Sequence, residues 1–139
     1  MKNPYYEIEV AASLDNLQQV LSFLEEKLEA AECPMKVLMQ ITVAAEEIFV
    51  NIANYAYAPN TGMATVCLTI SESPRAASIT FRDSGMPFDP LAKEDPDVTL
   101  PAEERQIGGL GIYMTKKAMD EMRYEYTNGQ NVLTLIKNF

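Results

Sequence analysis

Residues 46–55 read EEIFVNIANY, and two patterns meet in this stretch. Its apolar residues continue a series at three- and four-residue spacing that runs from Leu38 to Ile52, which is typical of one buried helix face. Pro34 suits the first turn of such a helix. We therefore predict a helix that begins near Pro34 and reaches about Tyr57.

A polar stripe lies nearly opposite this apolar face. Glu47, Asn51 and Asn54 fall within about 60° of one another around the helix axis. A solvated surface is the ordinary explanation, but the same side also carries Val43 and Val50 and no Lys or Arg. We therefore favour a polar cavity, where an amide oxygen can bind Mg²⁺ and a carboxylate can orient or deprotonate a nucleophile.

The rest of the chain supplies strands and two more helices. Alternating residues predict strands at 5–10, 65–70, 78–82, 124–126 and 132–136, with Asn128-Gly129 as a two-residue hairpin turn. Helices are predicted at 14–31, with Ser13 as N-cap, and at 109–120. This order predicts a single α+β domain over residues 1–139, a two-layer sandwich with helices on one face of a mixed, largely antiparallel sheet.

Composition excludes several classes of function. The chain has 139 residues, a net charge of −9 and no histidine, so it has no Ser-His-Asp triad, no His-bound zinc and no phosphohistidine of its own. With only 11 Lys and Arg residues, it is a poor match for nucleic acid or an anionic membrane.

Localisation signals are also lacking in the sequence. The first residues contain no apolar core of a signal peptide, and no run approaches the roughly 18 apolar residues of a membrane span. Cys33 and Cys67 form no CxxC pair, and we expect both to be reduced. We therefore expect a cytoplasmic protein.

A long loop, residues 83–108, lies between the predicted strand at 78–82 and the predicted helix at 109–120. Gly108-Gly109-Leu110-Gly111 ends it and leads directly into a helix. Such a helix start presents free N–H groups and the positive end of the helix dipole, which suits a phosphate. A flexible junction is the alternative explanation, because short glycine clusters are weak motifs.

The other end of the loop begins with Asp83-Ser84-Gly85-Met86-Pro87-Phe88-Asp89-Pro90. Asp83 closes a strand just before Gly85, and its carboxylate can accept a hydrogen bond from an exocyclic amine such as that of adenine. Met86 and Phe88 can supply apolar walls. The alternative is an ordinary Asp-Ser-Gly turn that Asp83 caps.

Together these three segments resemble one family. Glu47 with Asn51, the stretch 83–90 and the cluster 108–111 match, in order and spacing, the N, G1 and G2 boxes of the gyrase, heat-shock-protein-90, histidine-kinase and MutL ATPases. The Pro-Phe-Asp-Pro variant and the small size resemble the anti-sigma-factor serine/threonine kinase branch. The resemblance covers nearly the whole chain and implies the Bergerat ATP-binding fold, with an ATP lid over about residues 89–108.

The resemblance also assigns roles at the nucleotide. Glu47 falls on the general base, Asn51 on the Mg²⁺-binding asparagine, Asp83 on the adenine-reading aspartate and Gly85 on the glycine beside the base. The remaining candidates match family positions that lie along the phosphates or, for Asn54, beside the nucleotide. They are Asn54, Arg105, Gly108, Gly109, Leu110 and Gly111.

The resemblance further implies an ATP- and Mg²⁺-dependent kinase that phosphorylates an anti-sigma-factor antagonist of the STAS type and binds a sigma factor, as a homodimer. One departure is Tyr55, where the family often has histidine. Another is the strongly acidic lid. Two alternatives stay open: a nucleotide-gated binding module without kinase activity, and an ATPase or histidine-kinase module that acts on a histidine in trans.

Overall fold

The computed structural model describes residues 4–92 and 109–139. Its strands and α-helices, in chain order, are β1 (Tyr5–Ala11), α1 (Leu17–Ala30), α2 (Met35–Asn51), β2 (Met63–Ser71), β3 (Ala76–Asp83), α3 (Gly109–Ala118), β4 (Glu121–Thr127) and β5 (Gln130–Asn138). Short helical turns are η1 (Leu14–Asn16), the π-helical η2 (Ile52–Ala56) and η3 (Pro90–Ala92). Every predicted strand and helix is present. The predicted lid over about 89–108 lies mostly outside the described residues.

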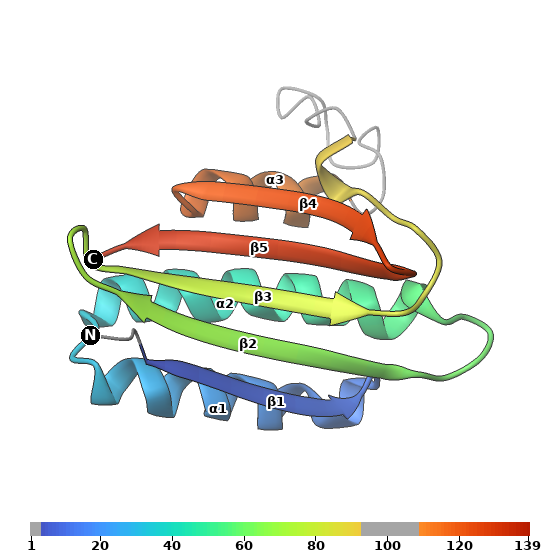
Figure 1. Cartoon of the computed structure of the whole chain (residues 1–139), viewed down its shortest axis with the longest axis horizontal. Helices are drawn as coiled ribbons and strands as arrows, with labels where there is room; N and C mark the ends of the chain where they lie inside the picture. Colours follow the sequence, from blue (N-terminus) through green and yellow to red (C-terminus); the bar gives the residue numbers. More distant parts are fainter. Residues whose placement is uncertain (1–3, 93–108) are drawn as a thin grey trace.

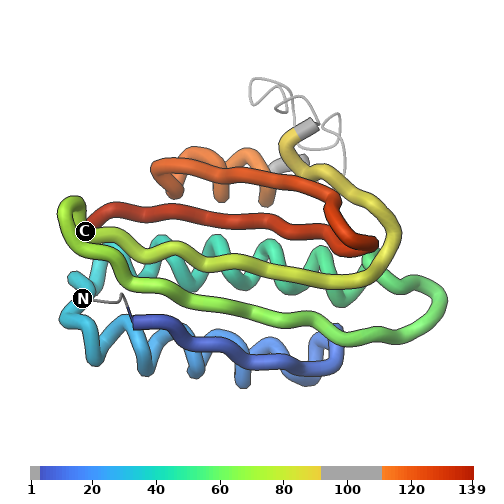
Figure 2. Tube along the Cα trace, viewed as in Figure 1, coloured from blue at the N-terminus to red at the C-terminus, as the bar shows by residue number. Residues whose placement is uncertain are grey.

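The five strands form one sheet in the order β1-β2-β3-β5-β4 (Figure 2). All four pairings are antiparallel, so the expectation of a mixed sheet is wrong in that detail. The reason is the last hairpin. β3 and β4 run in the same direction on either side of α3, but β5 returns between them and pairs with both.

The helices cover one face of this sheet, as predicted (Figure 1). α2 lies in the middle of the helical layer and contacts both α1 and α3. Its inner side chains pack on the inward residues of the central strands, where Phe49, Ile41, Leu68, Phe81 and Leu135 are at most 1% exposed. Burial of this apolar surface is the main stabilising contribution to the fold.

The local signals at helix and turn boundaries are confirmed. The Ser13 hydroxyl accepts a hydrogen bond from the Asp15 N–H at 3.2 Å, although it caps η1 rather than an α-helix. Pro34 is the N-cap of α2. Asn128 and Gly129 both have positive φ, 54° and 76°, which is the type I′ geometry that joins twisted strands.

One helical stretch, Met35–Ala56, is long and apolar enough by length and composition to cross a membrane. In the fold it is α2 with η2, and one side of it is buried in the core, whereas Met35, Met39 and Val43 are exposed. Its position as the central helix of a two-layer domain therefore accounts for the buried part of its apolar surface.

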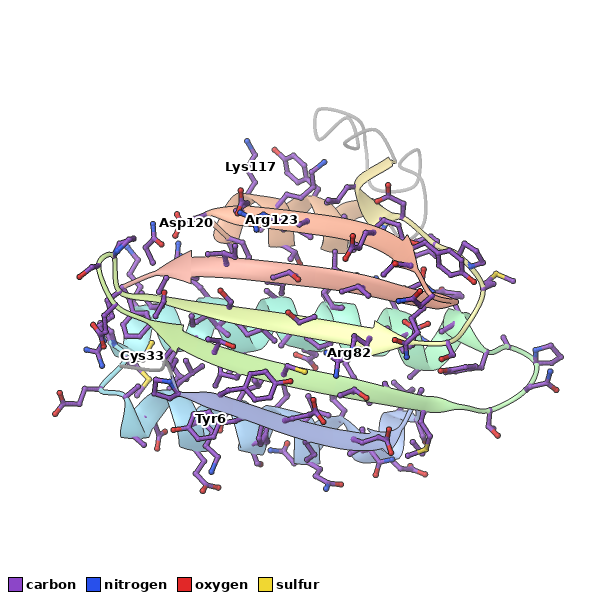
Figure 3. All side chains as sticks on the ribbon, in the orientation of Figure 1. Tyr6, Cys33, Arg82, Lys117, Asp120 and Arg123 are labelled. Carbon is purple, nitrogen blue, oxygen red and sulfur yellow. The ribbon has the colours of Figure 1, made fainter. Side chains whose placement is uncertain are left out.

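The other face of the sheet carries many polar side chains. Arg82 lies on this face (Figure 3) and its Nη2 is 3.0 Å from Glu7 Oε1. The Tyr5 hydroxyl lies 3.2 Å from the Cys67 sulfur and 2.7 Å from the same Glu7 oxygen, and hydrogen bonding with these two groups, together with burial, raises the pKa of Tyr5 to about 12. Cys33 and Cys67 are both free thiols, as expected, and burial raises the pKa of each.

Candidate functional site

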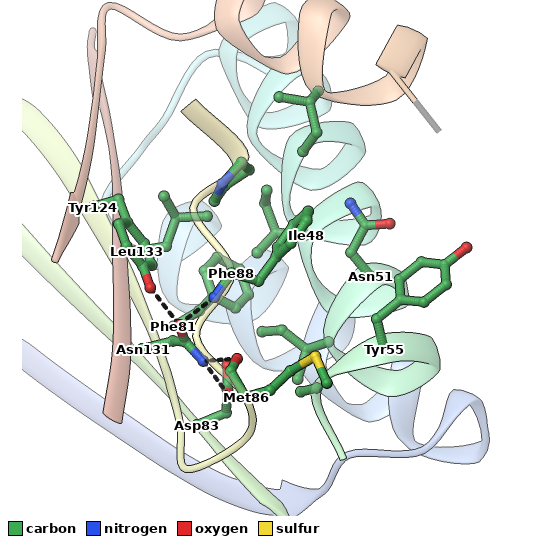
Figure 4. A pocket seen from close by; sticks show the side chains of 14 residues that line it. Ile48, Asn51, Tyr55, Phe81, Asp83, Met86, Phe88, Tyr124, Asn131 and Leu133 are labelled. Atoms are coloured by element: carbon green, nitrogen blue, oxygen red, sulfur yellow. Dashed lines mark hydrogen bonds between the residues drawn. The ribbon is translucent and has the colours of Figure 1, made fainter. Parts of the chain in front are cut away.

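A pocket opens where the C-terminal end of α2 and η2 lies over the ends of β3 and β5. Its walls are mainly apolar and include Ile48, Ile52, Phe81, Met86, Phe88 and Ile112. Figure 4 shows Asn51 and Tyr55 on the helical side and Asp83, Asn131 and Tyr124 on the strand side. An apolar slot with a few polar groups at its edge is the usual form of a small-molecule site.

Asp83 is the buried acid of this pocket, with 5% of its surface exposed. It is the last residue of β3, and its carboxylate Oδ1 accepts from the Gly85 N–H at 2.9 Å and from Asn131 Nδ2 at 3.0 Å. Because both bonds end on Oδ1, the second oxygen, Oδ2, remains for a donor in the pocket. The turn that Asp83 caps and the ligand role predicted for it are therefore compatible.

The loop that follows Asp83 is held close to η2. The Met86 N–H donates to the Ala56 carbonyl at 2.9 Å. A Cβ added at Gly85 would lie 2.2 Å from the same carbonyl oxygen, a distance that no real side chain tolerates. Glycine is therefore required at position 85 because two backbone segments meet there.

Asn51 and Glu47 lie one helical turn apart on α2, as predicted. Asn51 Nδ2 donates to Glu47 Oε1 at 3.3 Å. Asn51 lines the pocket, whereas Glu47 lines a separate groove between α2 and α3, together with Val43, Met114 and Gly111. The pair therefore stands at the boundary between the pocket and the groove.

Gly111 meets the Glu47 carboxylate directly. A Cβ at position 111 would lie 2.1 Å from Glu47 Oε1, so only glycine leaves room for this carboxylate against the first turn of α3. Residues 47 and 111 are far apart in the sequence. Their contact brings the first and third predicted segments together.

The remaining predicted residues have different placements. Asn54 lies in η2, is exposed and is not among the residues that line the pocket. Gly109 and Leu110 are the first residues of α3. Arg105 and Gly108 lie outside the described residues.

Asn131 is the polar residue that sequence reasoning missed. It is 6% exposed and contacts Asp83, Met86, Phe88 and Tyr124. The buried residues of β5 are Asn131, Leu133 and Leu135, and the residues between them lie on the other face of the sheet. A polar amide at one of these inward positions was the one sign in the sequence that Asn131 belongs to a site. That signal is readable only once the strand register is known.

Possible metal ligands are sparse. Within residues 4–92 and 109–139 no group of three or more Cys, Asp or Glu side chains is placed to hold a metal. Near the pocket, the Asn51 side chain can supply one metal ligand. Its amide nitrogen donates to Glu47, so its amide oxygen is left to bind a metal ion. A single amide oxygen suits Mg²⁺ that takes its other ligands from phosphates and water.

Comparison with known proteins identifies the class. The family described as "Histidine kinase-like ATPase domain" matches residues 10–137. The chain therefore belongs to the histidine kinase-like ATPase domain family, and the predicted superfamily is confirmed. Membership in this family indicates that the chain uses ATP.

Individual relatives narrow the class further. Serine/threonine-protein kinase BtrW of Bordetella bronchiseptica is 25% identical over 128 residues, which cover 92% of this chain and 89% of that protein. Serine-protein kinase RsbW of Bacillus cereus is 28% identical over 95 residues, 66% of this chain and 58% of that protein. Both relatives are named as protein kinases that act on serine, or on serine and threonine.

A solved structure shares the fold. The crystal structure of the RsbU and RsbW domains of Rv1364c from Mycobacterium tuberculosis matches with a TM-score of 0.69 at 18% identity. The match covers 96% of this chain and 32% of that one. At this identity the likeness shows the α+β fold, which confirms the predicted architecture.

Proposed function

We propose that this chain is an ATP-dependent protein serine/threonine kinase that phosphorylates an anti-sigma-factor antagonist of the STAS type. The observation that carries the proposal is the Glu47–Asn51 pair, which stands between an apolar pocket with a buried acid and the first turn of α3. The names of the two curated relatives support the same activity.

Adenine would occupy the apolar pocket. Its exocyclic amine is a donor, and Asp83 Oδ2 is the oxygen left to accept it. Met86 and Phe88 would contact the ring from the loop after β3, and Ile52 from the helix side. Asp83 therefore orients the base, and the apolar walls supply most of its burial.

The phosphates would lie toward the start of α3, beyond Asn51. Gly109, Leu110 and Gly111 form the first turn there, and the N–H groups of a first turn have no partner within their own helix. Arg105 and Gly108 remain predicted contributors. Mg²⁺ bound through the Asn51 amide oxygen would offset phosphate charge.

Glu47 would act on the acceptor hydroxyl. Its carboxylate lines the groove between α2 and α3. A Ser or Thr of a second protein can therefore reach Glu47 through this groove without displacing the adenine from its pocket. Glu47 accepts or orients the hydroxyl proton while the acceptor oxygen attacks the γ-phosphorus and the bond to the leaving ADP oxygen breaks.

The wider role is proposed from the resemblance. The protein would bind and silence a sigma factor, and phosphorylation of the antagonist would decide which partner it holds. We also propose a cytoplasmic homodimer, with no nucleic-acid or membrane partner. Sedimentation of the purified chain tests the dimer, and a monomer at micromolar concentration would contradict it.

Transfer of label from γ-labelled ATP tests the central claim. The purified chain is incubated with the antagonist and Mg²⁺, and phosphoserine or phosphothreonine is identified by mass spectrometry. Label on the antagonist supports the kinase. Tight ATP binding without transfer would support the first alternative, a nucleotide-gated binding module, and label on a histidine would support the second, a module that acts on a histidine in trans.

A further inference from the structure

Asn131 is joined to both polar and apolar parts of the pocket. It is the direct cross-strand partner of Asp83, because β3 and β5 pair in the register that places residue 83 opposite residue 131. Its Nδ2 donates to Asp83 Oδ1 at 3.0 Å and to the Met86 carbonyl at 2.8 Å. Its Oδ1 accepts from the Phe88 N–H at 3.0 Å and from the Tyr124 hydroxyl. Figure 4 shows these bonds meeting at one side chain.

The four contacts allow one orientation of the Asn131 amide. With the amide turned over, its oxygen would face the Asp83 carboxylate and the Met86 carbonyl, and its NH₂ group would face the Phe88 N–H. Acceptor would then meet acceptor and donor would meet donor inside a buried site, which is costly. Burial raises the pKa of Tyr124, so its hydroxyl keeps the proton that it donates.

This orientation decides what Asp83 offers to a base. Oδ1 is occupied by the Asn131 and Gly85 donors, and only Oδ2 is left toward the pocket. A carboxylate oxygen accepts a hydrogen bond from the 6-amino group of adenine. The same oxygen repels the 6-oxo group of hypoxanthine or guanine, because two acceptors would face each other.

Asn131 also holds the apolar wall. The Met86 carbonyl and the Phe88 N–H belong to the loop whose side chains line the pocket, and both bond to the amide. On its other side the same loop is tied to η2 by the Met86 N–H and the Ala56 carbonyl. The amide therefore sets the distance between the carboxylate and the loop.

We propose that Asn131 is the positioning residue that makes the pocket selective for 6-amino over 6-oxo purine nucleotides. It acts through Asp83 and the loop of residues 84–88 and need not touch the nucleotide. The inference rests on the proposed function, because it assumes that a purine base enters this pocket.

The test compares two nucleotides on matched variants. Asn131→Asp keeps the size and the acceptor for Phe88 but replaces the amide donor to Asp83 with a second carboxyl group, and Asn131→Leu removes both the donor and the acceptor. Thr134→Ala is the control, because Thr134 lies on the same strand and pairs with Thr80 on the outer face at 3.1 Å. Dissociation constants for Mg-ATP and Mg-ITP are measured by calorimetry, with thermal unfolding as a check of the fold.

Wild type and Thr134→Ala should prefer ATP to ITP. Both Asn131 variants should lose about tenfold or more in ATP affinity while ITP affinity changes less than about threefold, so the preference collapses. A residue with a purely structural role would weaken both nucleotides alike. If Asn131→Leu does not fold, the isosteric Asn131→Asp carries the test.

An unchanged ATP-to-ITP ratio in a folded Asn131 variant overturns the inference. Equal binding of both nucleotides by the wild type overturns it as well, and in either case the kinase proposal stands. Failure of the wild-type chain to bind ATP at all would instead contradict the proposed function itself.

Discussion

The buried acid of the pocket and the acid of the groove are held in opposite ways. Asp83 is 5% exposed and accepts two hydrogen bonds, from the Gly85 backbone and the Asn131 amide. Glu47 is partly exposed and accepts a 3.3 Å bond from Asn51. The recognition end of the site is therefore organised before a ligand arrives, whereas the chemical end is left adjustable.

This difference suits two separate tasks. A base-binding group gains affinity from being preorganised, because no ordering has to follow binding. A carboxylate that must meet both a phosphate and a hydroxyl from a second protein needs freedom to adjust, and catalytic hydrogen bonds are often long in the absence of substrates. Substitutions at the two acids should therefore separate binding from transfer.

The largest expected effect is at the groove. Glu47→Gln should lower phosphoryl transfer to the antagonist by about 10²–10⁴-fold, because an amide cannot take the proton, and should leave ATP affinity within about twofold. Transfer is measured with γ-labelled ATP and affinity by calorimetry. Glu29→Gln, at an exposed acid of α1 outside the groove, is the control for lost charge. Full transfer by Glu47→Gln would exclude Glu47 as the base.

Gly111→Ala tests the same end of the site through packing. The new Cβ would occupy the place of Glu47 Oε1, and the flexible Glu47 side chain can swing away at small cost to folding. Displacement of the carboxylate by about 1 Å should reduce transfer by about 100-fold.

The double variant Glu47→Gln with Gly111→Ala tests whether Gly111→Ala lowers phosphoryl transfer by displacing the Glu47 carboxylate. Gly111→Ala should add nothing further to Glu47→Gln if it acts only through the carboxylate. Additive losses would show that position 111 matters for another reason, such as backbone contact with phosphate.

Asp83→Asn should act on recognition rather than transfer. Loss of the carboxylate acceptor should weaken ATP by about 10–100-fold, since a hydrogen bond to a charged group is replaced by a facing NH₂ group. Calorimetry measures the affinity, and transfer at saturating ATP should recover. Asp89→Asn is the control, because Asp89 is exposed and accepts a hydrogen bond from the Leu91 N–H at 2.8 Å. Unchanged ATP affinity would contradict the adenine assignment.

The smallest effect is expected at Asn54. This residue shares the polar stripe with Glu47 and Asn51 but is exposed in η2, outside the pocket lining. Asn54→Ala should change ATP affinity by less than about twofold, as is usual for surface positions. A tenfold loss in the same titration would support the predicted role of Asn54 beside the nucleotide.

Much of the site was predictable because its signals are local. The four-residue spacing of Glu47 and Asn51 on a helix places them one turn apart whatever the rest of the chain does. Asp83 before Gly85 predicts a turn at a strand end, and Asn128-Gly129 predicts a hairpin. Asn131 could not be found this way, because its partners lie 43 to 48 residues away in the chain, apart from Tyr124.

By itself, the sequence determined the elements, the helical layer and the class of site, since hydrophobic period and turn residues act over a few neighbours. It also excluded histidine chemistry within the chain. Only the tertiary structure decided that the sheet is fully antiparallel, that Gly111 receives the Glu47 carboxylate and that Asn131 stands opposite Asp83. The physical reason is that strand register and helix contact are set by packing between distant segments, and no local pattern encodes them.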